Sequence, residues 1–271
     1  MITSSRNSEI VLVTGGSSGI GKACCNQLSD SRTVYGASRT ETQSDRWTYL
    51  KMDITDEASV REAVNSIILR HDRIDAVVHC AGSSLTGSAE ETTQAEALQQ
   101  FDTNYFGTVR VLRAVLPIMR RQGSGKLVVI GSIGGLIGLP FQAHYSATKF
   151  ALDGMVEAFR QEVRPFNIYV SVLHPGNFKT ALNEHRIRPQ NVAPDSPYKT
   201  ACERAAKFYA DEEIDARSPV IVARKVERIL NQKRPRVRYL VGTWLELLGV
   251  LGKRILPSAL FDLVVRLFYF P

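Results

Sequence analysis

The sequence predicts an α/β fold built on one doubly wound parallel sheet, and three observations lead to this prediction. Short runs of β-branched and apolar residues alternate along the chain with longer segments whose apolar residues have helical spacing. The first of these runs ends in a glycine-rich turn at 14–21, which opens a helical segment. With 271 residues and 44% hydrophobic content, the chain is large enough to bury one sizeable core.

In the first part of the chain, near-continuous apolar runs predict four strands, because such runs are typical of parallel strands that are covered on both faces. They are EIVLVT (9–14), TVYGAS (33–38), WTYLKM (47–52) and IDAVVHC (74–80). Between these runs, apolar residues three or four positions apart predict helices over 19–30 and 56–71.

The rest of the chain continues the alternation with longer helical segments, predicted over 95–122 and 143–165. Three more strands are predicted at KLVVIG (126–131), IYVSVLH (168–174) and VRYLVG (237–242). The polar stretch 177–218 is interrupted by prolines, so we expect one long irregular loop beside the substrate. This organisation predicts a single seven-stranded domain over 1–242, including that loop, and a helical extension over 243–271.

The net charge of +7 lies at the C-terminal end. From residue 224 onward, ten basic residues stand against three acidic ones, so residues 1–223 are neutral overall. With no basic stripe interleaved with aromatics and no zinc-finger spacing, the sequence argues against a nucleic-acid partner and a metal site. The four cysteines lack C-x-x-C spacing, and the polar N-terminus lacks a signal-peptide core, so we expect a cytoplasmic protein.

The turn TGGSSGIG at 14–21 predicts a dinucleotide site. Glycines let the backbone turn sharply and approach a pyrophosphate, while the free N–H groups at a helix start favour anionic oxygens. The residues expected to contact the dinucleotide there are Gly15, Ser17, Ser18, Gly19, Ile20 and Gly21.

Two residues beyond the next strands bear on the choice of cofactor. Arg39 ends the second strand, about twenty residues after the turn, where NAD enzymes usually carry an acid and where an arginine can meet a 2′-phosphate. Arg39 therefore favours NADP(H), the alternative being a solvated arginine. For Asp53, two roles stay open: a contact with the adenine, or the start of the turn before the helix near Asp56.

Tyr145 and Lys149 are a candidate acid/base pair, because residues four apart share one face of a helix. A free phenol titrates near pH ~10, and a nearby ammonium stabilises the phenolate. Ser132 follows a predicted strand thirteen residues before Tyr145 and adds a hydroxyl group.

Together these motifs resemble the short-chain dehydrogenase/reductase family over about residues 9–242. The matching features are T-G-x-x-x-G-I-G at 14–21, Asn104 in DTNYFG, Ser132, Y-x-x-x-K at 145–149, and PG at 175–176 followed by Thr180. The resemblance implies a Rossmann-type fold, NADP(H) as cofactor, and hydride transfer between the nicotinamide and a carbonyl or alcohol. It also implies a homodimer formed through the helices that contain Asn104 and Tyr145.

The same resemblance implies a role for each catalytic residue. Tyr145 would donate a proton to a carbonyl oxygen or accept one from an alcohol, while Ser132 would orient the carbonyl and stabilise charge on its oxygen. Lys149 would hold the cofactor ribose and lower the pKa of Tyr145, and Asn104 would position a water that relays protons to Lys149. Further cofactor contacts would come from Ala81, Gly82, Pro175, Gly176 and Thr180.

One segment departs from the family pattern: where the family usually reads N-N-A-G, this chain reads HCAG at 79–82. The family's asparagines mainly tie the central strands together and border the adenosine. The change therefore bears on cofactor affinity or rigidity rather than on the type of reaction. We expect His79 to be a core residue and Cys80 to pack as a small apolar side chain.

The segment GSIGGLIGLPFQAHYS at 131–146 points to the substrate. It is apolar and rich in glycine, and it resembles the same segment of hydroxysteroid and retinol dehydrogenases. A wall formed by Leu136, Ile137, Leu139, Pro140 and Phe141 favours a lipophilic substrate such as a steroid, retinoid or acyl-lipid ketone, although these residues can instead pack a subunit interface. The alternative functions are reduction of small polar carbonyls, NAD-dependent oxidation of small polar alcohols, and non-catalytic NADPH binding.

The extension cannot cross a membrane, because charged residues interrupt it well before the roughly 18 to 20 apolar residues that a span needs. Pro257 divides it into two predicted helices, over about 243–254 and 258–270. In the second, Ser258, Asp262 and Arg266 form one thin polar stripe on an otherwise apolar helix. Two roles stay open, a lid over the substrate cleft and a peripheral contact with a membrane surface, and both hold if the substrate arrives from lipid.

Overall fold

The computed structural model describes residues 8–180, 186–190, 192–214 and 216–269. Within these residues the core is a parallel seven-stranded sheet in the order β3-β2-β1-β4-β5-β6-β7, which confirms the predicted fold class. The strands are β1 (Ile10–Thr14), β2 (Thr33–Ser38), β3 (Thr48–Lys51), β4 (Ala76–His79), β5 (Gly125–Ile130), β6 (Ile168–Pro175) and β7 (Arg238–Val241). The chain runs outward in both directions from β1 and β4, so the carboxyl ends of these two strands form the switch point where such sheets bind ligands.

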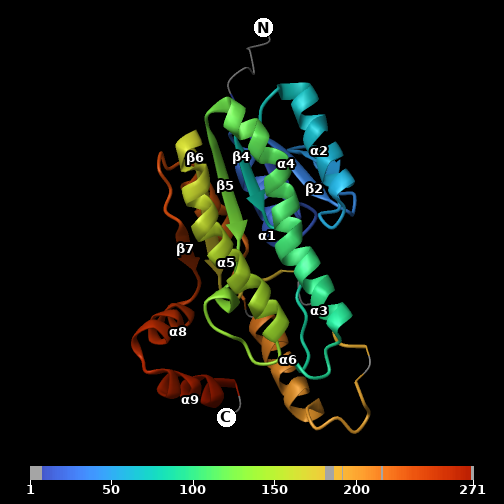
Figure 1. Ribbon diagram of the computed structural model, residues 1–271, viewed down its shortest axis with the longest axis vertical. Coiled ribbons are helices and arrows are strands. Elements are labelled where there is room, and N and C mark those ends of the chain that lie inside the picture. The colour runs from blue at the N-terminus through green and yellow to red at the C-terminus, as the bar shows by residue number, and fades with distance from the viewer. Residues whose placement is uncertain (1–7, 181–185, 191, 215, 270–271) are drawn as a thin grey trace.

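Helices cover both faces of the sheet (Figure 1), and the alternation along β1 shows how the sequence builds two cores. Ile10 and Leu12 pack on one face with α2 (Glu57–His71), α4 (Gly107–Gln122) and α5 (Ala143–Val163). Val11 and Val13 pack on the other face with α1 (Gly19–Leu28) and α7 (Val220–Leu230). Strands buried on both sides explain why the predicted strands have near-continuous apolar sequences.

The helix predicted over 95–122 is divided into three parts. It consists of α3 (Gln94–Phe101), a π-helical turn η1 (Asp102–Phe106) and α4. A π turn inserts one extra residue into the helical ladder, and such bulges occur frequently at functional sites. Because the apolar spacing continues through it, the sequence pattern does not reveal this turn, which contains Asn104.

The prediction that 177–218 is irregular is wrong for its C-terminal part, where the structure has α6 (Lys199–Ile214). Pro194 and Pro197 precede this helix and Pro219 follows it, so these prolines flank the helix instead of breaking it. Its buried stripe includes the small residues Ala205 and Ala206, which make a weak apolar signal. The helix α7 was also missed. Residues 181–185, 191 and 215 of the predicted loop lie outside the described residues.

The two helices predicted in the C-terminal extension are confirmed as α8 (Trp244–Ile255) and α9 (Ser258–Tyr269), with 270–271 outside the described residues. Thr243 and Glu246 form a capping box at the start of α8. In Figure 1 both helices lie beyond the carboxyl ends of the strands, at the same end of the molecule as α6. Among the described residues, no helix has the length and apolar character needed to cross a bilayer.

Candidate active site

The glycine turn after β1 is shaped by close backbone approaches. Gly15 and Gly19 have φ values of 70° and 50°, which L side chains rarely adopt. A Cβ atom at Gly21 would lie 2.0 Å from the Gly15 carbonyl oxygen, and one at Gly15 would lie 2.9 Å from Ala81 N. The turn therefore packs the start of α1 closely against the end of β4. It leaves a backbone cradle with no side chain at Gly15 or Gly21.

The first turn of α1 opens into this cradle. Ser17 and Ser18 precede the helix, and Gly19, Ile20 and Gly21 begin it. The N–H groups of a first helical turn have no partner within the helix, and together with the helix dipole they suit a phosphate group. The residues predicted around a dinucleotide therefore fit its pyrophosphate.

The segment after β6, residues 176–180, lies next to the glycine turn that follows β1. Pro175 ends β6, Gly176 N donates to Val241 O at 2.9 Å, and the Thr180 Cβ would be 3.2 Å from a Cβ atom at Gly19. The predicted nicotinamide-side residues Pro175, Gly176 and Thr180 thus follow one strand end and reach the predicted phosphate-side residues.

Glu246 is a site residue that the sequence prediction missed. Its Oε2 accepts from Thr243 N at 2.6 Å in the capping box, while its Oε1 accepts from Asn177 N at 2.6 Å. A Cβ atom at Gly176 would lie 2.2 Å from Glu246 Oε1, so this carboxylate rests directly on the backbone beyond β6. The T-x-x-E pattern signals the cap, but the contact with Asn177 depends on the tertiary fold.

Arg39 and Asp53 lie close enough to interact electrostatically at the ends of β2 and β3. Arg39 is exposed directly after β2. Asp53 Oδ1 accepts from Thr55 N at 2.9 Å and from Thr55 Oγ1 at 2.7 Å, which confirms its role in the turn before α2. Partial burial raises the pKa of Asp53, but these hydrogen bonds and the charges of Arg39 and Arg110 outweigh burial and lower it. A contact with adenine stays a prediction.

Ser132, Tyr145 and Lys149 are brought together as predicted. Ser132 follows β5 and begins the short helix η2 (Ile133–Gly135), with its Oγ accepting from Gly134 N at 3.0 Å. Burial raises the pKa of Tyr145, while a hydrogen bond with Ser132 and the charge of Arg186 act in the lowering direction. Lys149 Nζ lies 5.8 Å from the centre of the Tyr145 ring.

Lys149 itself is buried. Its Nζ donates to Ile130 O at 3.1 Å, and burial lowers the pKa of Lys149 to about 8. A buried ammonium near its own pKa is suited to exchange protons and to bind polar groups in the cleft.

Asn104 projects from the π turn towards Lys149. Its Nδ2 donates to Ser83 O and to Thr148 Oγ1 at 3.0 Å each, and its Oδ1 accepts from Ser83 N at 2.8 Å. A Cβ atom at Gly82 would lie 3.1 Å from Asn104 Oδ1 and 3.8 Å from Lys149 Nζ. The four predicted catalytic residues and Gly82 therefore meet at one place, and the relay water stays a prediction.

The HCAG segment keeps the central strands tied. The His79 Nδ1 shares a hydrogen bond of 2.9 Å with Thr14 Oγ1, which also accepts from Ala81 N at 3.3 Å. His79 thus links β4 to β1, and burial lowers its pKa to about 3, which keeps it neutral. A hydrogen bond with Cys24 and burial raise the pKa of Cys80, so this thiol packs as an inert side chain. His79 is thus a buried core residue, although its Nε2 has no hydrogen-bond partner among the described residues, and Cys80 packs against the core as a partly buried side chain, as predicted.

A buried network below Ser132 was also missed. His174 Nδ1 lies 2.8 Å from the Ser132 carbonyl oxygen and His174 Nε2 lies 3.1 Å from Asp153 Oδ1. Arg238 of β7 donates to both oxygens of Asp153, with its Nε 2.8 Å from Oδ1 and its Nη2 2.8 Å from Oδ2. Residues from α5, β6 and β7 therefore fix the backbone of the serine, a contact with no local sequence signal.

The predicted apolar wall is covered by the extension. Ile133 and Ile137, with Leu136 beside them, pack against Val250 of α8 and Phe261 of α9. Leu139 lies near Gly134, Pro140 O accepts from Tyr209 OH at 2.8 Å, and Phe141 turns the chain with a φ of 57°. The apolar wall next to Ser132 is thus covered by the two C-terminal helices α8 and α9.

One cation reaches this wall from the segment after β6. The guanidinium carbon of Arg186 lies 5.3 Å from the centre of the Tyr209 ring. Because the charge of Arg186 acts on the pKa of Tyr145, this arginine lies within electrostatic reach of the predicted acid/base. Its position in a polar loop gives no sequence signal for this role.

Comparison with known proteins adds independent findings. A family model described as short chain dehydrogenase matches residues 9–191. The 3-ketodihydrosphingosine reductase of Bacteroides thetaiotaomicron is 36% identical over 263 residues, covering 96% of this chain and 98% of that protein. Retinol dehydrogenase 8 of Bos taurus is 31% identical over 255 residues, covering 86% and 81%. The crystal structure of a short-chain dehydrogenase from Streptomyces avermitilis has a TM-score of 0.82 at 28% identity, covering 96% of this chain and 97% of that one.

Proposed function

Because this chain belongs to the short-chain dehydrogenase/reductase family, whose members are oxidoreductases of alcohols and ketones, we propose that it is an NADPH-dependent reductase of a lipophilic ketone. The observation that carries the proposal is the meeting of Asn104, Ser132, Tyr145 and Lys149 at the carboxyl ends of the strands. A non-catalytic module has no need for an acid/base tyrosine within reach of a buried lysine.

The proposed chemistry assigns one task to each side chain. When bound, the cofactor supplies the hydride for the carbonyl carbon. Tyr145 donates its phenolic proton to the carbonyl oxygen, and the Ser132 hydroxyl holds that oxygen and stabilises its developing charge. The Lys149 ammonium favours the phenolate that remains on Tyr145, and Asn104 holds the water through which a proton returns.

NADP(H) is favoured over NAD(H) because of Arg39. Its guanidinium is exposed at the end of β2, where an acid would accept from a ribose 2′-hydroxyl, and a guanidinium binds phosphate in a charge-assisted, bidentate manner. The side-chain-free cradle of Gly15 and Gly21 supports a dinucleotide in the turn after β1.

A long-chain ketone is the substrate class that the site supports. The wall beside Ser132 is apolar and contains Ile133 and Ile137. The side chains that cover it, Val250 and Phe261, are apolar as well. The names of the relatives in Bacteroides thetaiotaomicron and Bos taurus refer to a sphingoid ketone and to retinol, both lipophilic. We therefore propose 3-ketodihydrosphingosine as the first substrate to test, with retinal as the second and a short-chain ketone as the polar comparison.

The test is the oxidation of NADPH by the purified chain with each of these carbonyl compounds. Tyr145→Phe is expected to lower kcat by about a hundredfold to ten-thousandfold, because it removes the proton donor. The variant should keep its affinity for NADPH, measured by the fluorescence of the bound nucleotide. Tyr169→Phe, on β6, is the matched control and should keep full activity. Full turnover by Tyr145→Phe would refute the assignment.

We further propose that the protein is a homodimer through the helices that contain Asn104 and Tyr145. Phe106 and Phe150, in η1 and α5, expose 46% and 44% of their surface, and aromatic side chains are enriched at subunit interfaces. Phe150→Asp is expected to give a monomer in light scattering, whereas a mass that stays that of a dimer would contradict this interface.

A further inference from the structure

We propose that α8 and α9 dock on the surface of an anionic lipid bilayer through their outer apolar sides. The side chains that carry this proposal are Trp244, Leu248, Leu251, Ile255, Leu263 and Leu267, here called the docking face. Their exposed fractions range from 49% for Leu251 and Leu263 to 73% for Trp244. Soluble proteins rarely expose contiguous apolar patches of this kind without a partner.

The two helices bury very little against the rest of the chain. In the described residues, α8 buries Val250 and α9 buries Phe261, each 4% exposed, and both pack on Ile133 and Ile137. A helix that packs on a protein core normally buries a stripe about 100° wide and turns charged residues outward. Here the outward sides are the apolar ones, and no segment among the described residues covers them.

Positive charge lies beside the docking face. A pocket of about 290 Å³ between β7 and α8 is lined by Lys225, Arg236, Arg238 and Arg254 among others. Arg238 is neutralised by Asp153 and Glu157. The other three form no salt bridge with any described acid. Three uncompensated cations next to exposed leucines are complementary to phosphate headgroups above acyl chains.

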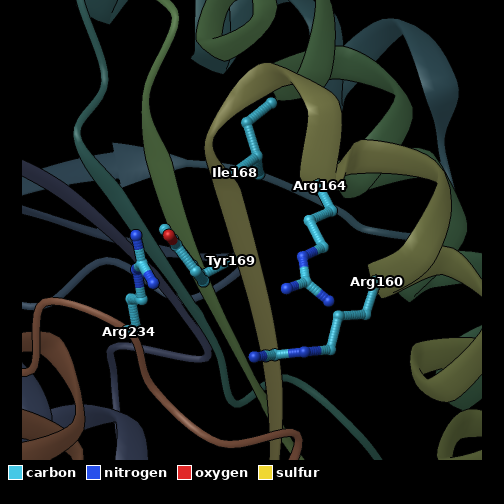
Figure 2. Close-up of a pocket in the computed structure, with 5 residues that line it drawn as sticks. All are labelled: Arg160, Arg164, Ile168, Tyr169 and Arg234. Carbon is cyan, nitrogen blue, oxygen red and sulfur yellow. The ribbon is translucent and has the colours of Figure 1, made fainter.

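A second basic pocket lies on the same side of the sheet but at the amino end of β6, away from the docking face. Figure 2 shows Arg160, Arg164 and Arg234 around Tyr169, near the start of β6, and the pocket measures about 280 Å³. Arg160 donates to Val170 O and Pro235 O at 2.6 Å each, which holds the segment before β7. In Figure 1 this segment, β7 and the helices α8 and α9 follow one side of the molecule.

These charges favour a bilayer over a second copy of the chain. A symmetric dimer through the docking face repeats one surface on both sides, so it would place two sets of Lys225, Arg236 and Arg254 beside one contact. Like charges facing each other across an interface are unfavourable, whereas an anionic membrane supplies the opposite charge.

The helices that carry the docking face also cover the apolar wall beside Ser132. If the proposed function holds, docking would therefore bring the substrate site close to the membrane surface. The inner sides of the same helices cover Ile133 and Ile137 next to Ser132, and the end of α9 meets α6 through Phe208 and Phe268, whose ring centres are 5.4 Å apart. A lipophilic ketone in the bilayer would then lie close to the apolar wall beside Ser132.

Trp244 provides the test. The chain has two tryptophans. Trp47 is 6% exposed and donates to Asn26 Oδ1 at 2.9 Å, so a change in emission on mixing with vesicles reports on Trp244. Vesicles of phosphatidylcholine with phosphatidylglycerol are expected to shift the emission to the blue and to carry the protein into the pellet, while pure phosphatidylcholine should do so much less. No substrate or cofactor is needed, so failure here is distinct from failure of the reductase assay.

Two kinds of variant separate the apolar and charged parts. Leu248→Ser and Leu267→Ser are each expected to weaken vesicle binding on the order of tenfold, with Leu69→Ser, a leucine 89% exposed on α2, as the control that binds normally. Arg236→Gln and Arg254→Gln are each expected to weaken it about fivefold, with Arg61→Gln as the control on α2. All should keep the unfolding temperature of the parent, because these side chains are on the surface.

Other outcomes would overturn the proposal. Equal binding to both kinds of vesicle would remove the role of the basic residues. A blue shift of Trp244 that appears without vesicles, grows with protein concentration and accompanies a doubled mass that Leu248→Ser abolishes would show that a second copy covers the docking face. Unchanged vesicle binding by both leucine variants would place the contact elsewhere.

Discussion

His174 is expected to fix the position of the catalytic serine, and His174→Ala tests this expectation. The ring is fully buried, with a carbonyl oxygen at one nitrogen and the Asp153 carboxylate at the other. The ring therefore bridges the Ser132 carbonyl oxygen and the Asp153 carboxylate through its two nitrogens. Arg238 holds Asp153 from the opposite side, which keeps this carboxylate ionised and in place.

The magnitude follows from the two hydrogen bonds. Losing the bond to an ionised carboxylate costs about 1.5–3 kcal/mol, and leaving the Ser132 carbonyl buried without its donor adds about 1 kcal/mol. A total of about 2.5–4 kcal/mol lowers the unfolding temperature by roughly 8 °C in a chain of this size. Because the Ser132 loop would lose its anchor, kcat should fall about tenfold with little change in the KM for NADPH.

The assay is thermal unfolding followed by circular dichroism, together with kcat and KM for the variant. His71→Ala is the matched control, since His71 makes one partly buried hydrogen bond of 2.7 Å to Tyr35 OH and lies far along the chain from the site. His174→Gln, which keeps one donor, should fall between the parent and His174→Ala. If His174→Ala unfolded within 2–3 °C of the control, roughly the effect of 1 kcal/mol, and kept its kcat, the reasoning would be wrong.

The remaining predictions concern charge. Asp153 has its pKa lowered from 3.8 to about 2 because its hydrogen bonds and ion pairs with His174 and Arg238 outweigh its partial burial. Its contribution of about 2 kcal/mol is therefore nearly complete above pH ~4 and is lost as the pH falls through ~2, so urea unfolding of the parent and of Asp153→Asn should converge as the pH reaches ~2; curves that stay parallel would contradict this. Burial lowers the pKa of Lys149 to about 8, so kcat/KM for reduction should decline above pH ~8, and a profile flat to pH ~10 would count against the role of its ammonium. Arg39→Asp should weaken NADPH about tenfold to a hundredfold and leave NADH unaffected or improved; equal losses for both nucleotides would exclude a 2′-phosphate contact. Glu246→Gln should raise the KM for the ketone several-fold because Asn177 loses a charge-assisted bond, with Glu162→Gln, at an exposed position on α5, as the control; an unchanged KM would show that the C-terminal extension is not held through this contact.

Much of the fold was predictable because a doubly wound sheet repeats a local pattern. Strands buried on both faces must be apolar throughout, and helices that cover them must be apolar on one side, so both leave periodic signals. The segments whose structure was not predicted lack such periodic signals. The π turn at Asn104 keeps the apolar spacing of the surrounding helix, and α6 buries alanines between flanking prolines.

The residues of the candidate site also fall into two groups, those that the sequence predicted and those that it did not. Residues that act through their own chemistry at a fixed spacing, such as Tyr145 and Lys149 one helical turn apart, were visible in the sequence. Residues that act by contact with a distant segment were not, because such contacts leave no spacing. Glu246 reaches Asn177 across 69 positions, and His174 reaches Ser132 across 42. His79 was recognised as a core residue, but its bond to Thr14 depends on the pairing of β1 with β4.

The C-terminal extension shows which properties the sequence alone determines and which depend on the tertiary structure. Hydrophobicity and the position of Pro257 alone determined that it forms two helices too short and too charged to span a bilayer, because length and helix breaking are local properties. Which side of each helix is covered depends on what lies across from it. Only the tertiary structure decided that Val250 and Phe261 meet the wall beside Ser132, and that the docking face around Trp244 is left outside.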